Sequence, residues 1–383
     1  MTKIASKIAW SRVLFLIGTP VAAIPLTYYY VSSQPFNLGI WLLFLFFYVF
    51  SIFGITGGYH RLFAHRAYQA NTALKWFYAL FGAAAIQNSI LVWGRDHRVH
   101  HRFVDTDKDP YNINRGFWYA HIGWMLQIEE SPVDLESYGR DFENDPIVMF
   151  QHKYYLPIAL AMCFVVPTIL GWMVGSALGG LLIVGLLRLV CVHHVTFFIN
   201  SWCHMWGKQT YSDKQTARDS FLMAIATMGE GYHNYHHIFA NDYRNGVKWY
   251  QWDPTKWFIR FCAWLGLASH LHRIPQHKIV KMQLEMDEKR AKSSWSREWQ
   301  TSFQEQLDSI KMKVDAAYAK MDQLRNEYRA LKAHYSQAHQ ARLNEIRAQI
   351  RIAKTEAKAA RRQWQNYIAW LSKASQQNFN LST

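Results

Sequence analysis

The sequence lacks the features of several common protein classes. Only four cysteines occur in 383 residues and none forms a CxxC pair, so a disulfide framework is not expected. No Rossmann or other redox-domain motif is present, so the chain has no redox domain of its own. The 27 acidic residues are outnumbered by 42 lysines and arginines. The resulting formal charge of +15 suits an anionic membrane surface, nucleic acid or an acidic partner.

Glycine and proline are absent from residues 276–383, although both occur along the first 275 residues. Half of the chain is hydrophobic, yet its mean hydropathy is slightly negative, which indicates an apolar part joined to a strongly polar part. We therefore predict a membrane domain over residues 1–275 and a basic C-terminal helical or coiled-coil extension over residues 276–383.

Four apolar runs each approach the roughly 20 residues that a helix needs to cross a bilayer. They cover about residues 13–31, 38–58, 154–174 and 178–199. The basic start of the chain favours a cytoplasmic N-terminus. Four crossings then place both termini on the cytoplasmic side of a multi-pass integral membrane protein, in the inner membrane if the cell is bacterial. Trp76 to Trp93, which is interrupted by polar residues, is expected to be a helix at or dipping into the interface, with a further full crossing as the alternative.

Beyond residue 300, apolar residues recur at alternating spacings of three and four. This heptad pattern runs from Phe303 to Trp364, with one break around His339. It predicts a long basic helix that self-associates or lies against anionic lipid. A solvated single helix without a partner is the alternative.

Histidines gather at the ends of the apolar runs, in three clusters and one single position: His60 and His65; His97, His100 and His101; His204; and His233, His236 and His237. Neutral imidazole is a common metal ligand, and the HxxHH spacing places three rings on one helix face. His60 and His65 lie about 140° apart on a regular helix, so they converge only at a helix end or a bulge. Nine imidazoles exceed the ligands of one ion, which indicates two metals of the kind that imidazole suits: Zn, Cu, Fe or Ni.

The clusters lie within longer motifs: TGGYHRLFAHR (Thr56–Arg66), RDHRVHH (Arg95–His101), NSWCH (Asn200–His204) and GEGYHNYHH (Gly229–His237). With these motifs the sequence resembles the membrane fatty acid desaturases, most closely the acyl-CoA delta-9 (stearoyl-CoA-type) branch, over about residues 13–272. The resemblance implies an all-α membrane fold with four transmembrane helices and a cytoplasmic helical cap that holds a di-metal site. It also implies an O₂-dependent oxidoreductase that inserts a cis double bond, at delta-9, into a saturated acyl chain.

The resemblance further implies a centre of two non-haem Fe²⁺ ions, with O₂ as co-substrate and no catalytic residue separate from the ligands. By similarity the nine histidines would be the ligands, and Asn200 would bind one metal through water. Glu230 either orients a ligand or makes a structural hydrogen bond. Because the chain has no redox domain, its electrons must come from an external small haem or iron–sulfur protein.

Substrate positions follow from the same resemblance. Six residues match the mouth and bend of an acyl tunnel: Gln87, Asn88, Trp93, Arg95, Asp96 and Trp124. Tyr48 and Ile52 match its closed end, and the bulk of Ile52 predicts a shorter acyl chain; ordinary packing is the alternative for both residues. Ile128-Glu129 replaces a basic pair that meets the CoA phosphates in the animal enzymes. An acyl-CoA, an acyl lipid or an acyl carrier protein therefore remains open as the substrate.

Two other functions fit less well. A lipid hydroxylase or ketolase on the same di-iron scaffold would share these motifs. A membrane metal transporter or sensor would need ionisable groups through the depth of the crossings, which here hold only Arg188, His193 and His194. Nucleic acid is not expected as a partner.

Overall fold

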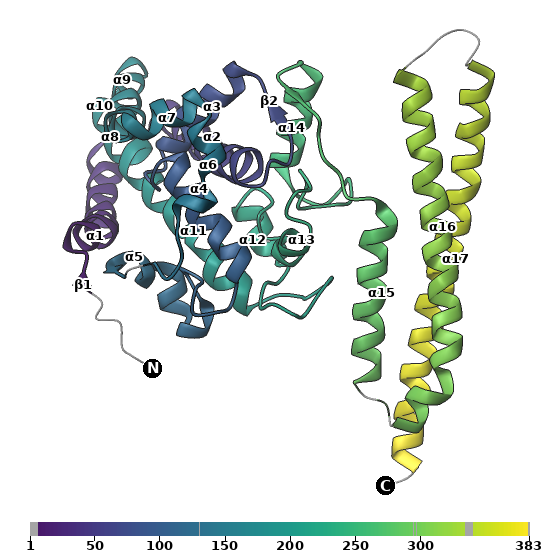
Figure 1. The fold of residues 1–383 in the computed structure, drawn as a ribbon. Coiled ribbons are helices and arrows are strands. Elements are labelled where there is room, and N and C mark those ends of the chain that lie inside the picture. The colour runs from purple at the N-terminus through teal and green to yellow at the C-terminus, as the bar shows by residue number, and fades with distance from the viewer. Residues whose placement is uncertain (1–6, 130, 294, 296, 334–339, 382–383) are drawn as a thin grey trace. The chain divides into compact units, whose positions relative to one another are not determined.

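The computed structural model describes residues 7–129, 131–293, 295, 297–333 and 340–381. The described residues form two compact units (Figure 1). The first unit lies within Met1–Gln209 and Lys214–Arg273, and the second within Thr210–Asp213 and Ile274–Thr383.

The first unit is helical, with two short antiparallel strand pairs. Its α-helices are α1 (Trp10–Ser33), α2 (Leu38–Phe53), α3 (Thr72–Ala83), α4 (Ile90–Phe103), α5 (Trp124–Leu126), α6 (Arg140–Glu143), α7 (Pro146–Lys153), α8 (Tyr155–Leu160), α9 (Val166–Met173), α10 (Ala177–Gly179), α11 (Arg188–Met205), α12 (Phe221–Ala226), α13 (His233–Ile238) and α14 (Pro254–Trp264). Tighter or wider helical turns are η1 (Gly54–Ala64), η2 (Ile113–Arg115), η3 (Tyr119–Gly123), η4 (Glu136–Tyr138), η5 (Ala161–Val165) and η6 (Gly180–Leu187). Strand β1 (Lys7–Ile8) pairs with β3 (Gln127–Ile128), and β2 (Gln69–Ala70) pairs with β4 (Ala268–Ser269).

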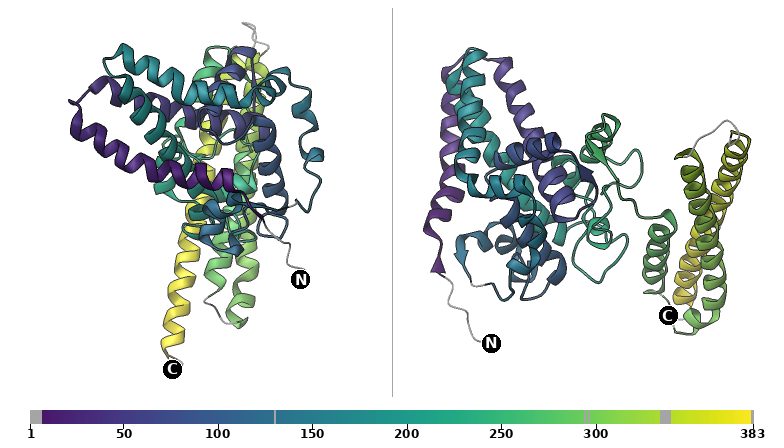
Figure 2. Two further views of the ribbon diagram at one scale, coloured as in Figure 1. Left: turned by 90° about the vertical axis from the view of Figure 1, so that its left-hand side faces the viewer. Right: turned by 45° about the horizontal axis from the view of Figure 1, so that its top comes forward.

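Four continuous helices are long and apolar enough to cross a membrane, as the sequence predicted. They are Trp10–Ser33, Leu38–Ala64, Tyr155–Met173 and Ala177–Met205, and they pack side by side (Figures 1 and 2). The second and fourth extend past the predicted ends at 58 and 199, because helical hydrogen bonding continues after the apolar run stops. These extensions carry His60 and His204 into the site.

The segment from Trp76 to Trp93 is not the single interfacial helix that the sequence predicted. Helix α3 ends at Ala83, and α4 begins at Ile90. Between them Ile86 and Asn88 adopt positive φ angles of 46° and 76°, which breaks the helix. The Ser89 hydroxyl then accepts the backbone N–H of Val92 and caps α4.

Ionisable groups in the fourth crossing face the protein interior, as expected for such groups. Arg188 is fully buried and donates to the backbone oxygens of Ala84 and Cys163, at 2.6 and 3.3 Å. His193 Nε2 lies 2.7 Å from the oxygen of Ala85. The contacts with Ala84 and Ala85 satisfy carbonyl groups that the end of α3 leaves open, and that with Cys163 joins α11 to η5. These polar groups therefore have a structural role.

The second unit contains α15 (Gln276–Lys292), α16 (Arg297–Ala333) and α17 (Gln340–Leu381). Helices α16 and α17 lie side by side in opposite directions (Figure 1), with Arg342 bonded to Glu327 and Tyr367 to Gln306. The predicted break around His339 lies outside the described residues.

The predicted heptad seam is apolar and buried, but its partner is the chain itself. Leu307, Val314 and Met321 of α16 pack in one core with Ala357 and Trp364 of α17. The second unit is therefore a helical hairpin with α15 against it, where the sequence suggested one long helix. The seam is thus covered within the chain, and self-association or lipid binding of this unit stays a prediction.

Candidate metal centre

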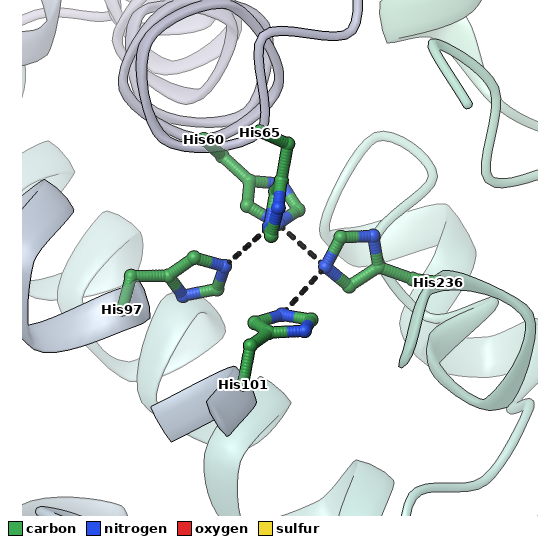
Figure 3. Close-up of side chains that lie close together, drawn as sticks. All are labelled: His60, His65, His97, His101 and His236. Carbon is green, nitrogen blue, oxygen red and sulfur yellow. Dashed lines mark hydrogen bonds between the residues drawn. The ribbon is translucent and has the colours of Figure 1, made fainter. Parts of the chain in front are cut away.

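Five histidines from three helical segments converge on one point (Figure 3). This first histidine group consists of His60, His65, His97, His101 and His236. One nitrogen from each ring lies within 4.8 Å of the others. The Nε2 atoms of His60 and His236 are 2.8 Å apart, and those of His236 and His101 are 2.9 Å apart.

The convergence of His60 and His65 depends on a π-helix. Residues Gly54–Ala64 form i→i+5 hydrogen bonds, and the His65 N–H continues this pattern to the His60 oxygen at 3.0 Å. Wider turns of this kind place residues five apart on the same face. The ring centroids of the two histidines are consequently 4.8 Å apart. The bulge that the sequence required is present.

A second histidine group lies beside the first and is fully buried. It consists of His100, His204, His233 and His237. The Nε2 atom of His233 is 3.0 Å from both His204 and His237. Each HxxHH motif is thus divided between the two groups. His97 and His101 belong to the first group and His100 to the second, whereas His233 and His237 belong to the second group and His236 to the first.

Acidic and hydroxyl partners fix the orientation of three rings. Nδ1 of His60 donates to Glu230 at 2.9 Å, and Nδ1 of His100 donates to Asp109 at 2.8 Å. Nδ1 of His204 donates to the Thr216 hydroxyl, also at 2.8 Å. A carboxylate accepts but does not donate, so it holds the ring proton on Nδ1. The Nε2 lone pair is then left facing the centre of the group.

The pKa of most of these histidines lies well below the usual value. Burial is the main cause, and the neighbouring imidazoles are the second. This applies to His65, His97, His101, His233, His236 and His237. They are therefore neutral at pH 7 and able to act as ligands. Burial acts against ionisation of Glu230, but His60 and Arg61 prevail and lower its pKa to about 2.

The donor atoms fit a pair of metal ions. Six pairs of nitrogens within the two groups lie 2.8 to 3.3 Å apart, too close for several lone pairs to face one another without a cation. Two nitrogens bound about 2.1 Å from one ion in neighbouring positions would be roughly 3 Å apart. Five and four imidazoles form two such sets, and this composition suits a transition metal.

A cavity of about 580 Å³ borders both histidine groups. His60 and His97 of the first group and His100 and His233 of the second line it. Apolar side chains also line it: Phe15, Leu16, Ile52, Ile55 and Ile86. Charged lining residues include Arg12, Lys108, Arg115 and Glu129. Such a cavity can hold a long apolar chain with a polar end group beside the histidines.

Most of the substrate residues predicted from the sequence line this cavity. Ile52, Gln87, Asn88, Trp93, Asp96 and Trp124 do so, as does Asn200. Burial raises the pKa of Asp96 to about 6 against the opposing effects of Arg12 and Arg95. Tyr48 and Arg95 are not among the lining residues that the structure describes. Tyr48 donates to the Ala226 oxygen at 3.1 Å, and Arg95 pairs with Glu143.

The Ile128-Glu129 position also lines the cavity, and Glu129 has a partner. Arg115 donates to both oxygens of Glu129 at 2.8 Å and lies 3.6 Å from the centre of the Tyr119 ring. A carboxylate beside phosphate would be unfavourable. Here Arg115 offsets the charge of Glu129.

Sequence reasoning missed the residues that hold the ligands in place. Asp109 and Thr216 lie in loops, and their separation from the histidine motifs gives no sign of contact. Arg61 lies inside the first motif, and its guanidinium joins Glu230 to Asp253. Only Glu230 was identified as a candidate, because it lies within the GEGYHNYHH motif.

Four candidate spans and two histidine groups beside a partly apolar cavity define a helical membrane protein whose clustered histidines are compatible with a metal site. The profile of the fatty acid desaturase family matches residues 36–272, and the chain belongs to this family. It is 45% identical over 292 residues to a probable acyl-CoA desaturase of Schizosaccharomyces pombe, covering 75% of this chain and 60% of that protein. It is 39% identical to acyl-CoA desaturase 1 of Saccharomyces cerevisiae, covering 75% of this chain and 57% of that protein. It is also 38% identical to stearoyl-CoA desaturase 5 of Bos taurus, covering 71% of this chain and 82% of that protein.

Proposed function

We propose that the protein is an O₂-dependent acyl desaturase that inserts a cis double bond at delta-9 of a saturated acyl chain. The observation that carries this proposal is the position of the cavity. One continuous space is bordered by histidines of both groups and by a separate apolar set that includes Phe15, Leu16 and Ile52. The family and its relatives, which are named acyl-CoA desaturases, support the same chemistry.

The nine histidines are the proposed ligands of two ferrous ions, five for one and four for the other. Asn200 lies on the wall of the cavity one turn before His204, and we assign it to a water on the four-histidine ion. When bound, the two ions supply the reduction of O₂ that removes hydrogen from a methylene without an acidic proton.

The chain's own residues bind and position the substrate. Phe15, Leu16 and Ile52 hold the acyl chain and exclude water from it. Trp93 stacks on His97, with ring centroids 4.8 Å apart, and borders the same cavity. Glu230 and Asp109 keep the Nδ1 protons of His60 and His100 in place, so these rings cannot rotate away from the reacting carbons.

The head group meets charged residues of the cavity wall. Arg12, Lys108 and Arg115 favour an anionic group there, which fits an acyl-CoA. The pairing of Arg115 with Glu129 reduces this preference, so an acyl lipid or acyl carrier protein is the alternative substrate.

We assign catalysis to residues 1–275 and an accessory role to residues 276–383. All nine histidines and every residue that lines the cavity belong to the first unit, which supports this division. The histidine groups lie at one end of the spans, next to the extensions of the second and fourth. With the basic N-terminal start, this supports a cytoplasmic active site and cytoplasmic termini.

Expression in a host that lacks unsaturated fatty acids tests the proposal. We expect iron in the purified protein and new lipids with a cis double bond between carbons 9 and 10. His100→Ala, which removes a ligand that Asp109 holds, serves as the inactive control. A hydroxylated or keto product would instead support a hydroxylase or ketolase. Bound iron without any oxidised acyl product would refute both.

A further inference from the structure

A small open hollow on the first unit lies over the first histidine group. This His65 hollow is lined by Ala64, His65, Arg66, Arg98, Ala240 and Asn241 and measures about 500 Å³. It has no described lining residue in common with the acyl cavity. The first group is therefore reached by two separate spaces.

His65 connects this hollow to the proposed metal. Seven of the nine histidines are buried, whereas His65 and His101 are partly exposed, and only His65 is among the described residues of the hollow. The Nε2 atom of His65 is 2.8 Å from that of His97, and the His60 and His65 rings are 4.8 Å apart. His60 and His97 line the acyl cavity. A redox protein docked over the hollow would thus be separated from the proposed ion of the first group by one imidazole ring. It would leave the acyl cavity open to the substrate.

The rim of the hollow is positively charged and rigid. Asp141 accepts from Arg66 at 2.6 Å and from Arg98 at 2.6 Å, so two arginines share one carboxylate. Against the opposing effect of burial, these arginines lower the pKa of Asp141 to about 2, and one positive charge is left in excess. Arg98 also donates to the oxygens of Phe63 and Ala64, which holds the wall of the hollow in place. The Arg66 side chain is 64% exposed and points its charge toward solvent.

We propose that the His65 hollow is the docking surface for the external electron donor, a small acidic protein with a one-electron cofactor near its surface. The proposal rests on the desaturase function. Two electrons from the donor and two from the acyl chain, which loses two hydrogen atoms, reduce one O₂ to two waters with two protons from solvent. Each docked donor supplies one electron through His65. The positive rim attracts the acidic donor and sets its orientation.

Two variants change the hollow without altering the ligands. Arg66→Asn removes the exposed charge, and asparagine tolerates the positive φ of 51° at this position. Asn241→Glu adds a negative charge at an exposed residue on the other side of the hollow. Lys208→Glu is the matched control, because Lys208 is an exposed basic residue of the same unit outside the hollow.

The full-length, iron-loaded protein is supplied with O₂, an acyl substrate and either a pre-reduced acidic [2Fe–2S] protein or a pre-reduced acidic haem protein. We expect each hollow variant to raise the donor KM about fivefold with little change in kcat, and to weaken its dependence on salt. Binding of the oxidised donor protein to the metal-free desaturase, measured by titration, should weaken by about the same factor. The Lys208→Glu control should match the wild type. When the iron is instead reduced with dithionite without air, the excess dithionite is removed and O₂ is then admitted, all variants should form product in a single turnover at the wild-type rate.

The dithionite experiment separates this proposal from the function on which it rests. If the wild type, reduced beforehand with dithionite and freed of its excess, forms no product when O₂ is admitted, the desaturase function fails. If it forms product but the hollow variants keep the wild-type donor KM, the donor docks elsewhere. Equal losses with dithionite and with donor protein would assign these residues to structure. If neither acidic protein reduces the wild type, an acidic donor is excluded.

Discussion

The Glu230 carboxylate lies 2.9 Å from Nδ1 of His60 and accepts two further bonds from Arg61, at 2.8 and 3.1 Å. All three side chains are buried. The carboxylate therefore fixes the ring proton of one proposed ligand while its own charge is balanced by the guanidinium. Such outer partners commonly set how well the ligands bind a metal.

We predict that Glu230→Ala weakens iron binding by about 10- to 100-fold, because His60 loses the partner that fixes its ring. Glu230→Gln should have a smaller effect, since its amide oxygen can still accept from Nδ1. Competition with a chelator measures the affinity, and Glu136→Gln, at an exposed acid, is the control. Unchanged affinity in Glu230→Ala would mean that packing alone orients His60.

The stability of the metal-free protein should depend steeply on pH. The folded-state pKa of six histidines in the two groups lies well below their unfolded value of about 6.5. Below that pH the unfolded chain binds more protons than the folded chain, so stability is complete above about 6.5 and is lost as the pH falls. Each such histidine contributes up to about 1.4 kcal/mol per pH unit.

Thermal unfolding of the metal-free protein in detergent at about pH 7.5 and about pH 5.5 measures this effect. We expect a clearly lower Tm at the lower pH. Iron should dissociate over the same range, because protons compete for the ligand nitrogens. Glu230 does not reverse the trend, since its lowered pKa of about 2 keeps it ionised throughout. Equal Tm values at the two pH values would contradict the predicted burial of neutral rings.

Ile52 should limit the length of the acyl chain. Its side chain is buried and lines the cavity together with other apolar residues. Ile52→Ala should shift the products toward longer chains, at a cost in stability of about 2 to 5 kcal/mol. Tyr48→Phe is the matched control, because the Tyr48 hydroxyl bonds to Ala226 and is not among the described lining residues. Gas chromatography measures the chain lengths of the products. An unchanged chain-length profile in Ile52→Ala would refute the role of Ile52 in limiting the acyl chain.

Local patterns predicted which residues form the site, but not how they divide. Hydropathy placed four spans, histidine spacing identified eight residues of the two groups, and His204 was identified from its single position at the end of the fourth apolar run. The split of His97 and His100 between groups depends on where α4 lies relative to η1, which supplies His60, and to α11, which supplies His204. No spacing within one helix records this. The contact of His204 with Thr216 likewise arises from tertiary packing.

The same limit applies to two helices. The sequence did not show that α3 ends at Ala83, because the break depends on backbone angles at Ile86 and Asn88 that apolar composition does not specify. A heptad pattern shows that a seam needs a partner, but not whether the partner is another chain. In α16 and α17 the chain supplies its own partner.

The second unit should be dispensable for the metal site. Trp364 is fully buried in the core between α16 and α17, so Trp364→Ala should destabilise the hairpin by about 3 to 5 kcal/mol. Met312→Ala, at a residue 67% exposed on α16, is the control and should change little. Limited proteolysis should cut residues 276–383 faster in Trp364→Ala alone.

Because the histidine groups lie wholly in the first unit, iron content and desaturation should persist in this variant and after truncation behind Pro275. Iron lost on truncation, with the truncated protein still folded, would instead make the hairpin part of the catalytic domain.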